Sequence, residues 1–290
     1  MRDRMKRRTF LKNAAITAAS MSMPAISLAE LQEPFSFWNK PVEPFGIIGN
    51  IYYVGVSDVS SFLITSPEGH ILIEGGFAET APHIEKNIHK LGFKLEDVKI
   101  LLTSHAHFDH AGGLAELKRI TGGKLYASKP EAVMLANGGK GDFHFGDQLQ
   151  FPPVSTDRIV SDNEQIQLGG VTMRSYLTPG HAKGCTTWTM TTTENGKRYN
   201  VVFVGSVSVP GYELKNNKKY PNIADDYTRS FEILKKLKCD IFLAPHSWDF
   251  NLKGKMAKRG ISGNPFIDPD GYKKAIKRAE NNFMKKMQGK

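Results

Sequence analysis

Hydrophobic positions from Phe45 onward alternate between short runs typical of β-strands and longer stretches with helical spacing. Strands are predicted at 47–48, 51–54, 61–65, 70–74, 98–103, 171–177, 186–192, 201–205 and 241–244. Helices are predicted at 79–91, 112–121, 224–237 and 273–290. Hairpin strands interleaved with single helices favour a layered α/β architecture with mixed sheets over an all-parallel barrel. Because no linker or repeat interrupts the pattern, we expect one domain over residues 30–290.

Residues 1–29 have the pattern of an export signal. Arg7 and Arg8 form a twin-arginine pair, a mildly apolar stretch covers 13–23, and small residues up to Ala29 are typical of a cleavage site. The pattern resembles signals of the bacterial twin-arginine route, which implies export of the folded protein by that machinery. No later apolar run reaches the length of about 18 residues that a spanning helix needs. We therefore expect a periplasmic protein without stable membrane association.

The composition is that of a globular protein, with 40% hydrophobic and 23% charged residues. The net charge is +10, but residues 1–29 carry much of it, and the remaining 33 Lys and Arg against 28 Asp and Glu leave +5. A second basic cluster at 273–290 alternates with apolar positions, as on an amphipathic surface helix. Since no aromatic stacking platform or groove-reading motif accompanies the charge, we expect no nucleic-acid partner.

The densest group of potential metal ligands follows the predicted strand 98–103. Its members are His105, His107, Asp109 and His110. Alternation along an extended chain brings the first three to one side, whereas His110 can join them only if the chain bends. The adjacent Gly112 and Gly113 provide backbone freedom for such a bend. Imidazole and carboxylate groups are ligands that suit zinc.

Two further histidines follow predicted strands in the same way. His181 lies in a Pro-Gly-His turn after 171–177, and His246 follows Pro245 after 241–244. We expect one metal on His105, His107 and His181, and a second metal on Asp109, His110 and His246. Three protein ligands leave each metal an open position, as at catalytic zinc sites. The other histidines are expected to be surface or local hydrogen-bonding residues, namely His70, His83, His89 and His144.

The order His-x-His-x-Asp-His after an apolar strand, with a later Pro-Gly-His and a C-terminal His, resembles the metallo-β-lactamase superfamily. The resemblance covers residues 35–290. It implies an α/β (α+β) fold, a four-layer αβ/βα sandwich with two Zn²⁺ ions at one edge of the paired sheets. Because the superfamily acts on several classes of substrate, the fold alone does not select one.

The segment after the predicted strand 201–205 narrows the choice of substrate class. Thiolesterases and lactonases of the superfamily have an aspartate that bridges both metals at the position of Ser206. In the third subclass of class B β-lactamases, serines such as Ser206 and Ser208 take its place, and His-Asp-His holds the second zinc. The resemblance implies that these serines bind the substrate carboxylate. The chain also resembles this subclass in the segments 138–145, 180–189 and 220–227.

The resemblance implies zinc-dependent hydrolysis of the β-lactam amide bond of penicillins, cephalosporins and carbapenems, and hence antibiotic resistance. Asp109 is the expected catalytic residue, because it would orient the metal-bound hydroxide. The expected partner is a small β-lactam substrate, and we expect a monomer. Two alternatives stay open: an exported hydrolase of the same fold acting on a lactone or thioester, and a zinc-binding protein without turnover. Ser206 disfavours the first alternative, and open coordination disfavours the second.

A few other residues carry narrower expectations. Glu74 stands where many relatives have Asp, and we expect it to support a ligand from behind. Cys185 is expected to be a small buried residue, although a bridge with Cys239 stays open. Three aromatic residues fit either an apolar wall beside the substrate or ordinary packing: Trp38, Phe143 and Phe145.

Overall fold

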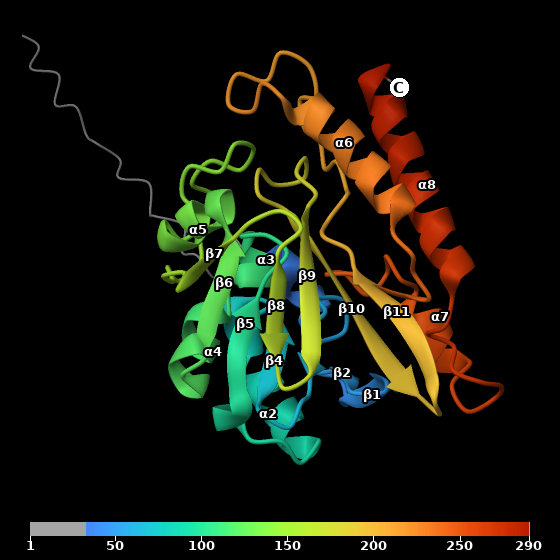
Figure 1. The fold of residues 1–290 in the computed structure, drawn as a ribbon. Coiled ribbons are helices and arrows are strands. Elements are labelled where there is room, and N and C mark those ends of the chain that lie inside the picture. Colours follow the sequence, from blue (N-terminus) through green and yellow to red (C-terminus); the bar gives the residue numbers. More distant parts are fainter. Residues whose placement is uncertain (1–32, 290) are drawn as a thin grey trace, which may run out of the picture.

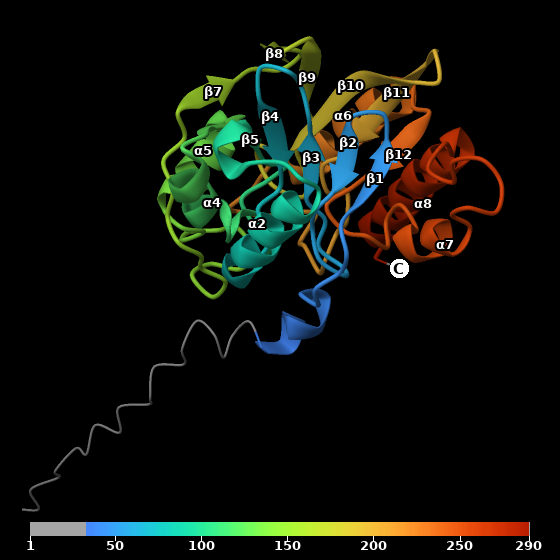
Figure 2. The ribbon, with the colours of Figure 1, turned by 90° about the horizontal axis from the view of Figure 1, so that it is seen from below.

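The computed structural model describes residues 33–289, so the export signal expected at 1–29 lies outside the described residues. The described chain forms two β-sheets that face each other, with helices on the outer face of each sheet (Figure 1). Seen from below, the layers follow one another as helices, sheet, sheet and helices (Figure 2). This mixed α/β sandwich confirms the fold class predicted from the sequence.

The first sheet has seven strands in the described part of the chain, and they lie side by side in sequence order. The strands are β1 (Phe45–Ile48), β2 (Ile51–Tyr53), β3 (Phe62–Ile64), β4 (His70–Ile73), β5 (Val98–Leu102), β6 (Lys124–Ser128) and β7 (Arg158–Val160). The pairs from β1 to β4 are antiparallel, as short turns allow, and the pairs from β4 to β7 are parallel. The parallel pairs need longer crossovers, and helices supply them.

The second sheet has five described strands in the spatial order β12-β11-β10-β9-β8. They are β8 (Gln165–Leu168), β9 (Val171–Leu177), β10 (Thr186–Glu194), β11 (Lys197–Phe203) and β12 (Ile241–Leu243). Only β11 and β12 pair in parallel among these neighbours, because the helix α6 crosses between them.

Helices cover both outer faces. The α-helices are α2 (Ala81–Lys90), α3 (Phe108–Ala111), α4 (Leu114–Thr121), α5 (Lys129–Ala136), α6 (Ile223–Lys236), α7 (Leu252–Ala257) and α8 (Pro269–Met287). Short 3₁₀ turns occur at η1 (Glu33–Trp38), η2 (Ala78–Thr80) and η3 (Leu95–Asp97). Helices α2, α4 and α5 lie beside the first sheet, and α6 and α8 lie beside the second (Figures 1 and 2). No helix of the described residues is both long and apolar enough to cross a membrane.

Alternation along the strands divides the core in two. In β4, Ile71 and Ile73 belong to the cluster that includes the side chains between the sheets, whereas Leu72 points the other way and packs with the helix-side cluster. Both clusters are buried, so the strands of the first sheet have apolar residues on both faces. A sheet covered on two faces is a rigid base for the loops that leave its strand ends.

Most predicted elements are found within two or three residues of their expected bounds, but residues 122–170 are an exception. The sequence analysis assigns no element there, and the structure has β6, α5, β7 and β8. The last two are short strands with exposed polar positions, and the apolar residues of α5 do not share one face. Such segments lack the periodicity on which the prediction depends. The helix expected at 112–121 begins at Leu114, and α3 precedes it.

Candidate metal centre

The loop after β5 carries four candidate ligands in a bent segment. β5 ends at Leu102, and one turn of helix, α3, begins at Phe108 directly after His107. This turn supplies the bend that brings His110 round to the other ligands. Gly112 follows at φ −56°, and a Cβ there would lie 2.6 Å from the backbone nitrogen of Ala78. Close approach of two backbone segments, rather than a left-handed conformation, therefore requires this glycine.

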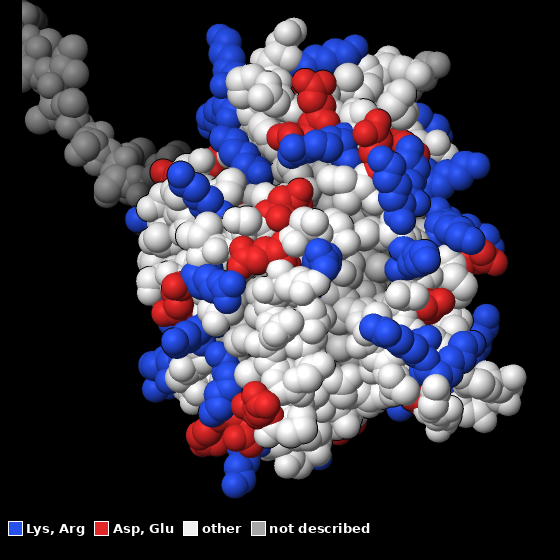
Figure 3. Space-filling view, viewed as in Figure 1, with Lys and Arg blue, Asp and Glu red and all other residues white. Residues whose placement is uncertain are grey.

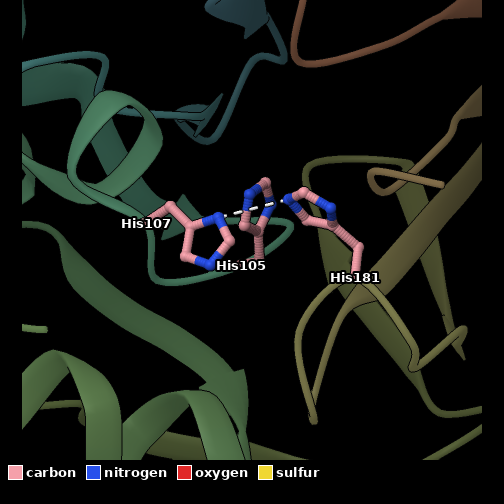
Figure 4. Close-up of side chains that lie close together, drawn as sticks. All are labelled: His105, His107 and His181. Atoms are coloured by element: carbon pink, nitrogen blue, oxygen red, sulfur yellow. Dashed lines mark hydrogen bonds between the residues drawn. The ribbon is translucent and has the colours of Figure 1, made fainter. Parts of the chain in front are cut away.

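The structure brings all six predicted ligands together in two groups. The groups are His105, His107 and His181, and Asp109, His110 and His246. Within each group the candidate ligand atoms lie within 4.8 Å of one another, and every residue is buried except the half-buried His246. Figure 4 shows how His105 and His107 come from the loop after β5 and meet His181, which comes from the loop after β9.

Hydrogen bonds orient the rings of the first group. The carbonyl oxygen of Ser208 can only accept, so Nδ1 of His181, 2.9 Å away, carries the hydrogen and Nε2 keeps a lone pair. That Nε2 lies 3.2 Å from Nδ1 of His107 (Figure 4). Nδ1 of His105 pairs with the Ser104 hydroxyl at 2.8 Å, while its Nε2 is buried without any hydrogen-bond partner. An unpaired buried nitrogen beside two others is the arrangement that a bound cation satisfies.

The second group joins a carboxylate to two imidazoles. Oδ2 of Asp109 lies 3.3 Å from Nε2 of His110 and 3.5 Å from Nε2 of His246. Nδ1 of His246 faces the carbonyl oxygen of Asp58 at 3.4 Å, so in the neutral ring its Nε2 lone pair points at the carboxylate. Two electron-rich atoms face each other favourably only with a cation between them. The donor set of both groups, nitrogen and carboxylate oxygen with three ligands each, fits zinc.

Burial keeps most of these imidazoles neutral, which is the form that binds metal. Burial and the neighbouring histidines hold the pKa values of His105, His110 and His181 well below the ordinary value. His107 differs, because burial lowers its pKa but the surrounding carboxylates, Asp142 first, raise it above the ordinary value. Burial opposes ionisation of Asp142 too, yet the contact with His107, with Oδ2 3.6 Å from Nε2, lowers its pKa to about 2. Asp142 therefore lies beside Nε2 of His107, while Nδ1 of the same ring faces His181.

Two buried carboxyl groups hold the ligand loops in place. Glu131, on α5, accepts the backbone N–H of Ala106 at 2.6 Å and that of Gly184 at 2.8 Å. It thus ties the loop of His105 and His107 to the loop of His181. Glu74 accepts the backbone N–H of Ser104 at 2.7 Å, directly before the first ligand. Glu74 therefore supports the ligand loop from behind, as expected from the sequence.

Ser206 and Ser208 lie beside the first group. Their hydroxyl oxygens are 3.3 Å apart, and that of Ser208 is 3.2 Å from Nδ1 of His181. Cys185 is buried below this segment, and its thiol lies 3.6 Å from the Ser206 carbonyl oxygen. Cys185 and Cys239 are both free, so the bridge left open by the sequence is not formed.

Aromatic rings border both groups on the open side. The Trp248 ring is stacked on His246, with ring centroids 4.1 Å apart, and it is 45% exposed. Trp38 contacts both rings, at 5.5 Å from His246 and 5.2 Å from Trp248. On the other side, Phe145 stands edge-on to His107 at 5.4 Å. The mouth of the centre is therefore partly apolar.

Three other residues considered in the sequence analysis, Phe143, His144 and His70, lie outside the two metal groups. Phe143 is buried against Tyr212 and Tyr220, so ordinary packing is the better interpretation of this residue. His144 contacts Tyr212 at 4.7 Å, beside the centre but outside both groups. His70 is buried and packs against a phenylalanine ring, far along the chain from the ligand loops.

The sequence analysis misses Glu131, Asp142 and Trp248. The first two lie in the stretch 122–170, where no element is predicted; the segment 138–145 that resembles the subclass contains Asp142, but no role is assigned to that residue. Trp248 could have been found, because it stands two residues after the ligand His246 in a loop that follows a strand.

Comparison with known proteins agrees with this geometry. The family model of the metallo-beta-lactamase superfamily matches residues 54–246. The native FEZ-1 metallo-beta-lactamase from Legionella gormanii has 43% sequence identity and a TM-score of 0.84, over 87% of this chain and 97% of that one. BJP-1 of Bradyrhizobium japonicum, a subclass B3 metallo-beta-lactamase, has 35% identity and a TM-score of 0.82, over 87% and 96%.

Other relatives match this chain over less than half of its length. The N-acyl homoserine lactonase AttM of Agrobacterium fabrum is 33% identical over 150 residues, which are 43% of this chain and 57% of that protein. The match with a probable metallo-hydrolase of Burkholderia pseudomallei spans 40% of that protein. The family model covers more than half of the chain, and solved structures match it at nearly full length. This chain is therefore a hydrolase that belongs to the metallo-beta-lactamase superfamily.

Proposed function

We propose that this chain is a zinc-dependent β-lactamase of the third subclass of class B. The observation that carries the proposal is the pair of three-ligand groups with Ser206 and Ser208, and no carboxylate, at the end of β11. Structures of FEZ-1 and BJP-1, both named as metallo-beta-lactamases, match nearly their whole length to this chain. Other members of the superfamily share the fold, so the site and not the fold selects the substrate.

The first group, His105, His107 and His181, would hold one zinc ion, and Asp109, His110 and His246 would hold the other. Bound zinc would polarise a substrate carbonyl and make a water molecule acidic at neutral pH. Asp109 would accept a hydrogen bond from the attacking water and so orient it toward the carbonyl carbon. Glu131 and Asp142 would keep the ligand rings in the geometry that this step requires.

Contacts with the substrate would come from the serines and the aromatic rings. The hydroxyl groups of Ser206 and Ser208, 3.3 Å apart, would donate hydrogen bonds to the carboxylate of a β-lactam. Trp38, Trp248 and Phe145 would pack against its apolar side groups. No serine needs to form a covalent intermediate, because an activated water attacks directly.

A lactonase of the same superfamily is the second candidate, and the match with AttM favours it. The residues at the site argue for the β-lactamase, since Ser206 stands where the lactonases that the chain resembles have a bridging aspartate. A lactone carries no carboxylate beside its ring for the two serines to bind.

The test is to follow a carbapenem and a cephalosporin by absorbance with the purified mature protein, first zinc-loaded and then stripped with a chelator. We expect hydrolysis that disappears with the metal and returns when zinc is added. A panel of acyl homoserine lactones and thioesters serves as the comparison. Turnover of that panel by the zinc-loaded protein, with no turnover of either β-lactam, would replace the proposal with the second candidate.

We also propose that the chain is exported to the periplasm by the twin-arginine route. Arg7 and Arg8, the apolar stretch 13–23 and the small residues up to Ala29 support this. Replacement of both arginines with lysine should leave the full-length chain in the cytoplasm of a bacterial host. Periplasmic mature protein from the doubly substituted chain would contradict the proposal.

A further inference from the structure

A cavity of about 310 Å³ lies on the far side of the loop that follows β11, between this loop and helix α8. None of the six candidate metal ligands lines it, but its wall includes Ser208, which contacts His181 of the first metal group. Its walls are mainly apolar and include Val204, Val207, Val209, Phe242, Ala275 and Ala279. Its volume is that of a site for a small ligand, at the lower end of the usual range.

The side chains of α8 explain why the cavity is hollow at one end and charged at the other. Ala275, Ala279, Asn282 and Lys286 follow one another at spacings of four, three and four residues, which places them on one face of the helix. The two alanines leave space against the sheet. One to two turns further along, Asn282 and Lys286 bring polar groups to the same face.

The rim of the cavity carries a surplus of positive charge. Arg278, Lys285 and Lys286 line it and are exposed, and no carboxylate of the described residues lies within 4.0 Å of any of them. In Figure 3, Lys and Arg side chains lie over the part of the molecule where α6 and α8 lie, with Asp and Glu side chains among them. The lining contains one acidic residue, the half-buried Asp249.

We propose that this cavity binds a small amphipathic anion, an aliphatic monocarboxylate, and that its occupancy affects the metal centre. The alkyl chain would lie along Ala275 and Ala279, against Val204 and Phe242. The carboxylate would lie between Asn282, Lys285 and Lys286, which all carry hydrogen-bond donors.

The link to the metal centre runs through the loop that forms the shared wall. Lys286 donates a hydrogen bond to the backbone carbonyl of Val209. The preceding carbonyl, that of Ser208, accepts from Nδ1 of His181 at 2.9 Å and from the hydroxyl of Tyr227 at 2.6 Å. A carboxylate that draws Lys286 away from Val209 would change the position of Ser208, and with it the orientation of the His181 ring. Binding at the two sites is then reciprocal, so zinc would also change the affinity for the anion.

The experiment titrates decanoate into the zinc-loaded mature protein by calorimetry, with decanol, acetate and a decyl ammonium salt as comparison ligands. We expect saturable binding of one decanoate per chain, and much weaker binding of the other three. The double substitution Lys285→Gln with Lys286→Gln should weaken decanoate binding at least about ten-fold, which corresponds to about 1.4 kcal/mol. Lys277→Gln, an exposed lysine of the same helix outside the cavity, is the matched control and should bind as the wild type does.

A second variant, Ala279→Leu, fills the cavity without touching the charges, and it should also reduce binding. The coupling is tested by measuring zinc affinity with and without saturating decanoate, and a difference is expected in the wild type and in Lys277→Gln but not in the two cavity variants. Equal binding of decanol and decanoate, or binding that both variants leave unchanged, would overturn the proposal. Decanoate bound directly at the metal centre would show itself as inhibition competitive with substrate that persists in all three variants, and this too would overturn it.

Discussion

The indole ring of Trp248 lies flat against the imidazole of His246, with 4.1 Å between the ring centroids and 12° between the planes. His246 is one of the three candidate ligands of the second metal group, so the exposed indole ring of Trp248 lies in direct contact with a metal ligand. Trp188, in contrast, is fully buried in the core and donates its indole N–H to the Thr103 carbonyl oxygen. The two tryptophans therefore have very different surroundings.

From this stacking we predict that zinc binding to the metal-free protein changes the tryptophan fluorescence, and that Trp248→Phe removes most of the change. The physical reason is that a cation on His246 alters the field at the stacked indole ring. Trp38→Phe is the matched control, because Trp38 touches the same imidazole less closely, at 5.5 Å. A fluorescence change that survives intact in Trp248→Phe would show that the second group does not take up zinc in this way.

Glu131 leads to a prediction about metal affinity. Its carboxylate accepts two backbone N–H groups, from Ala106 and Gly184, and a glutamine amide could accept only one of them without turning an N–H toward the other. We expect Glu131→Gln to fold and to bind zinc about 10–100-fold more weakly, as substitutions behind metal ligands do. Competition with a chromophoric chelator measures this. Glu116→Gln, on the exposed face of α4, should leave the zinc affinity unchanged, and equal affinities of both variants would contradict the role given to Glu131.

The difference between Glu131 and the six ligands shows what the sequence can predict. The ligands combine a distinctive residue type with a position after an apolar strand, and both are visible along the chain. Glu131 has a common residue type and acts through contacts 25 and 53 residues away in the sequence. These contacts exist only after β6 pairs with β5 and places the start of α5 between the two ligand loops. Tertiary pairing of this kind leaves no periodic pattern.

The same reasoning applies to the fold. Strands such as β5, with buried residues at most positions, and amphipathic helices such as α6 are predicted because burial imposes a pattern on them. β7 and β8, at the sheet edges, are short and partly exposed, so their sequences are less constrained. The stretch 122–170, which lacks predicted elements, is therefore also the stretch in which the roles of Glu131 and Asp142 are missed.

Substitutions in the second metal group should change the number of zinc ions bound per chain. Replacement of Asp109 or His246 with alanine removes one of three ligands, while both residues lie in loops or a single helical turn at the edge of the fold. We expect both variants to keep the circular dichroism of the wild type, to bind one zinc ion in place of two, and to lose hydrolysis by orders of magnitude. Metal analysis of the dialysed proteins measures this. Full activity in either variant would contradict the assignment of two metals.

Glu74 gives a prediction about pH. Burial raises the pKa of its carboxyl group from 4.5 to about 8, although hydrogen bonds from Ser104 and Thr103 lower it. The contacts fit a protonated group, because the Thr103 hydroxyl has one hydrogen but faces both Oε2 of Glu74, at 3.1 Å, and the His105 carbonyl oxygen, at 3.0 Å. If Glu74 supplies the hydrogen to Thr103, both contacts are hydrogen bonds.

Because the pKa of Glu74 is raised in the folded chain, its contribution to the free energy of unfolding decreases as the pH rises. Below pH 4.5 the carboxyl group is protonated in the folded and the unfolded chain, and its contribution to stability is fully present. Between 4.5 and 8 only the folded chain keeps the proton, so the free energy of unfolding falls by up to about 1.4 kcal/mol per pH unit. Glu74→Gln donates to Thr103 at every pH, so its unfolding free energy should fall less steeply over this range. Urea unfolding of the metal-free proteins at several pH values measures the two slopes, and equal slopes would show that Glu74 is ionised in the folded state.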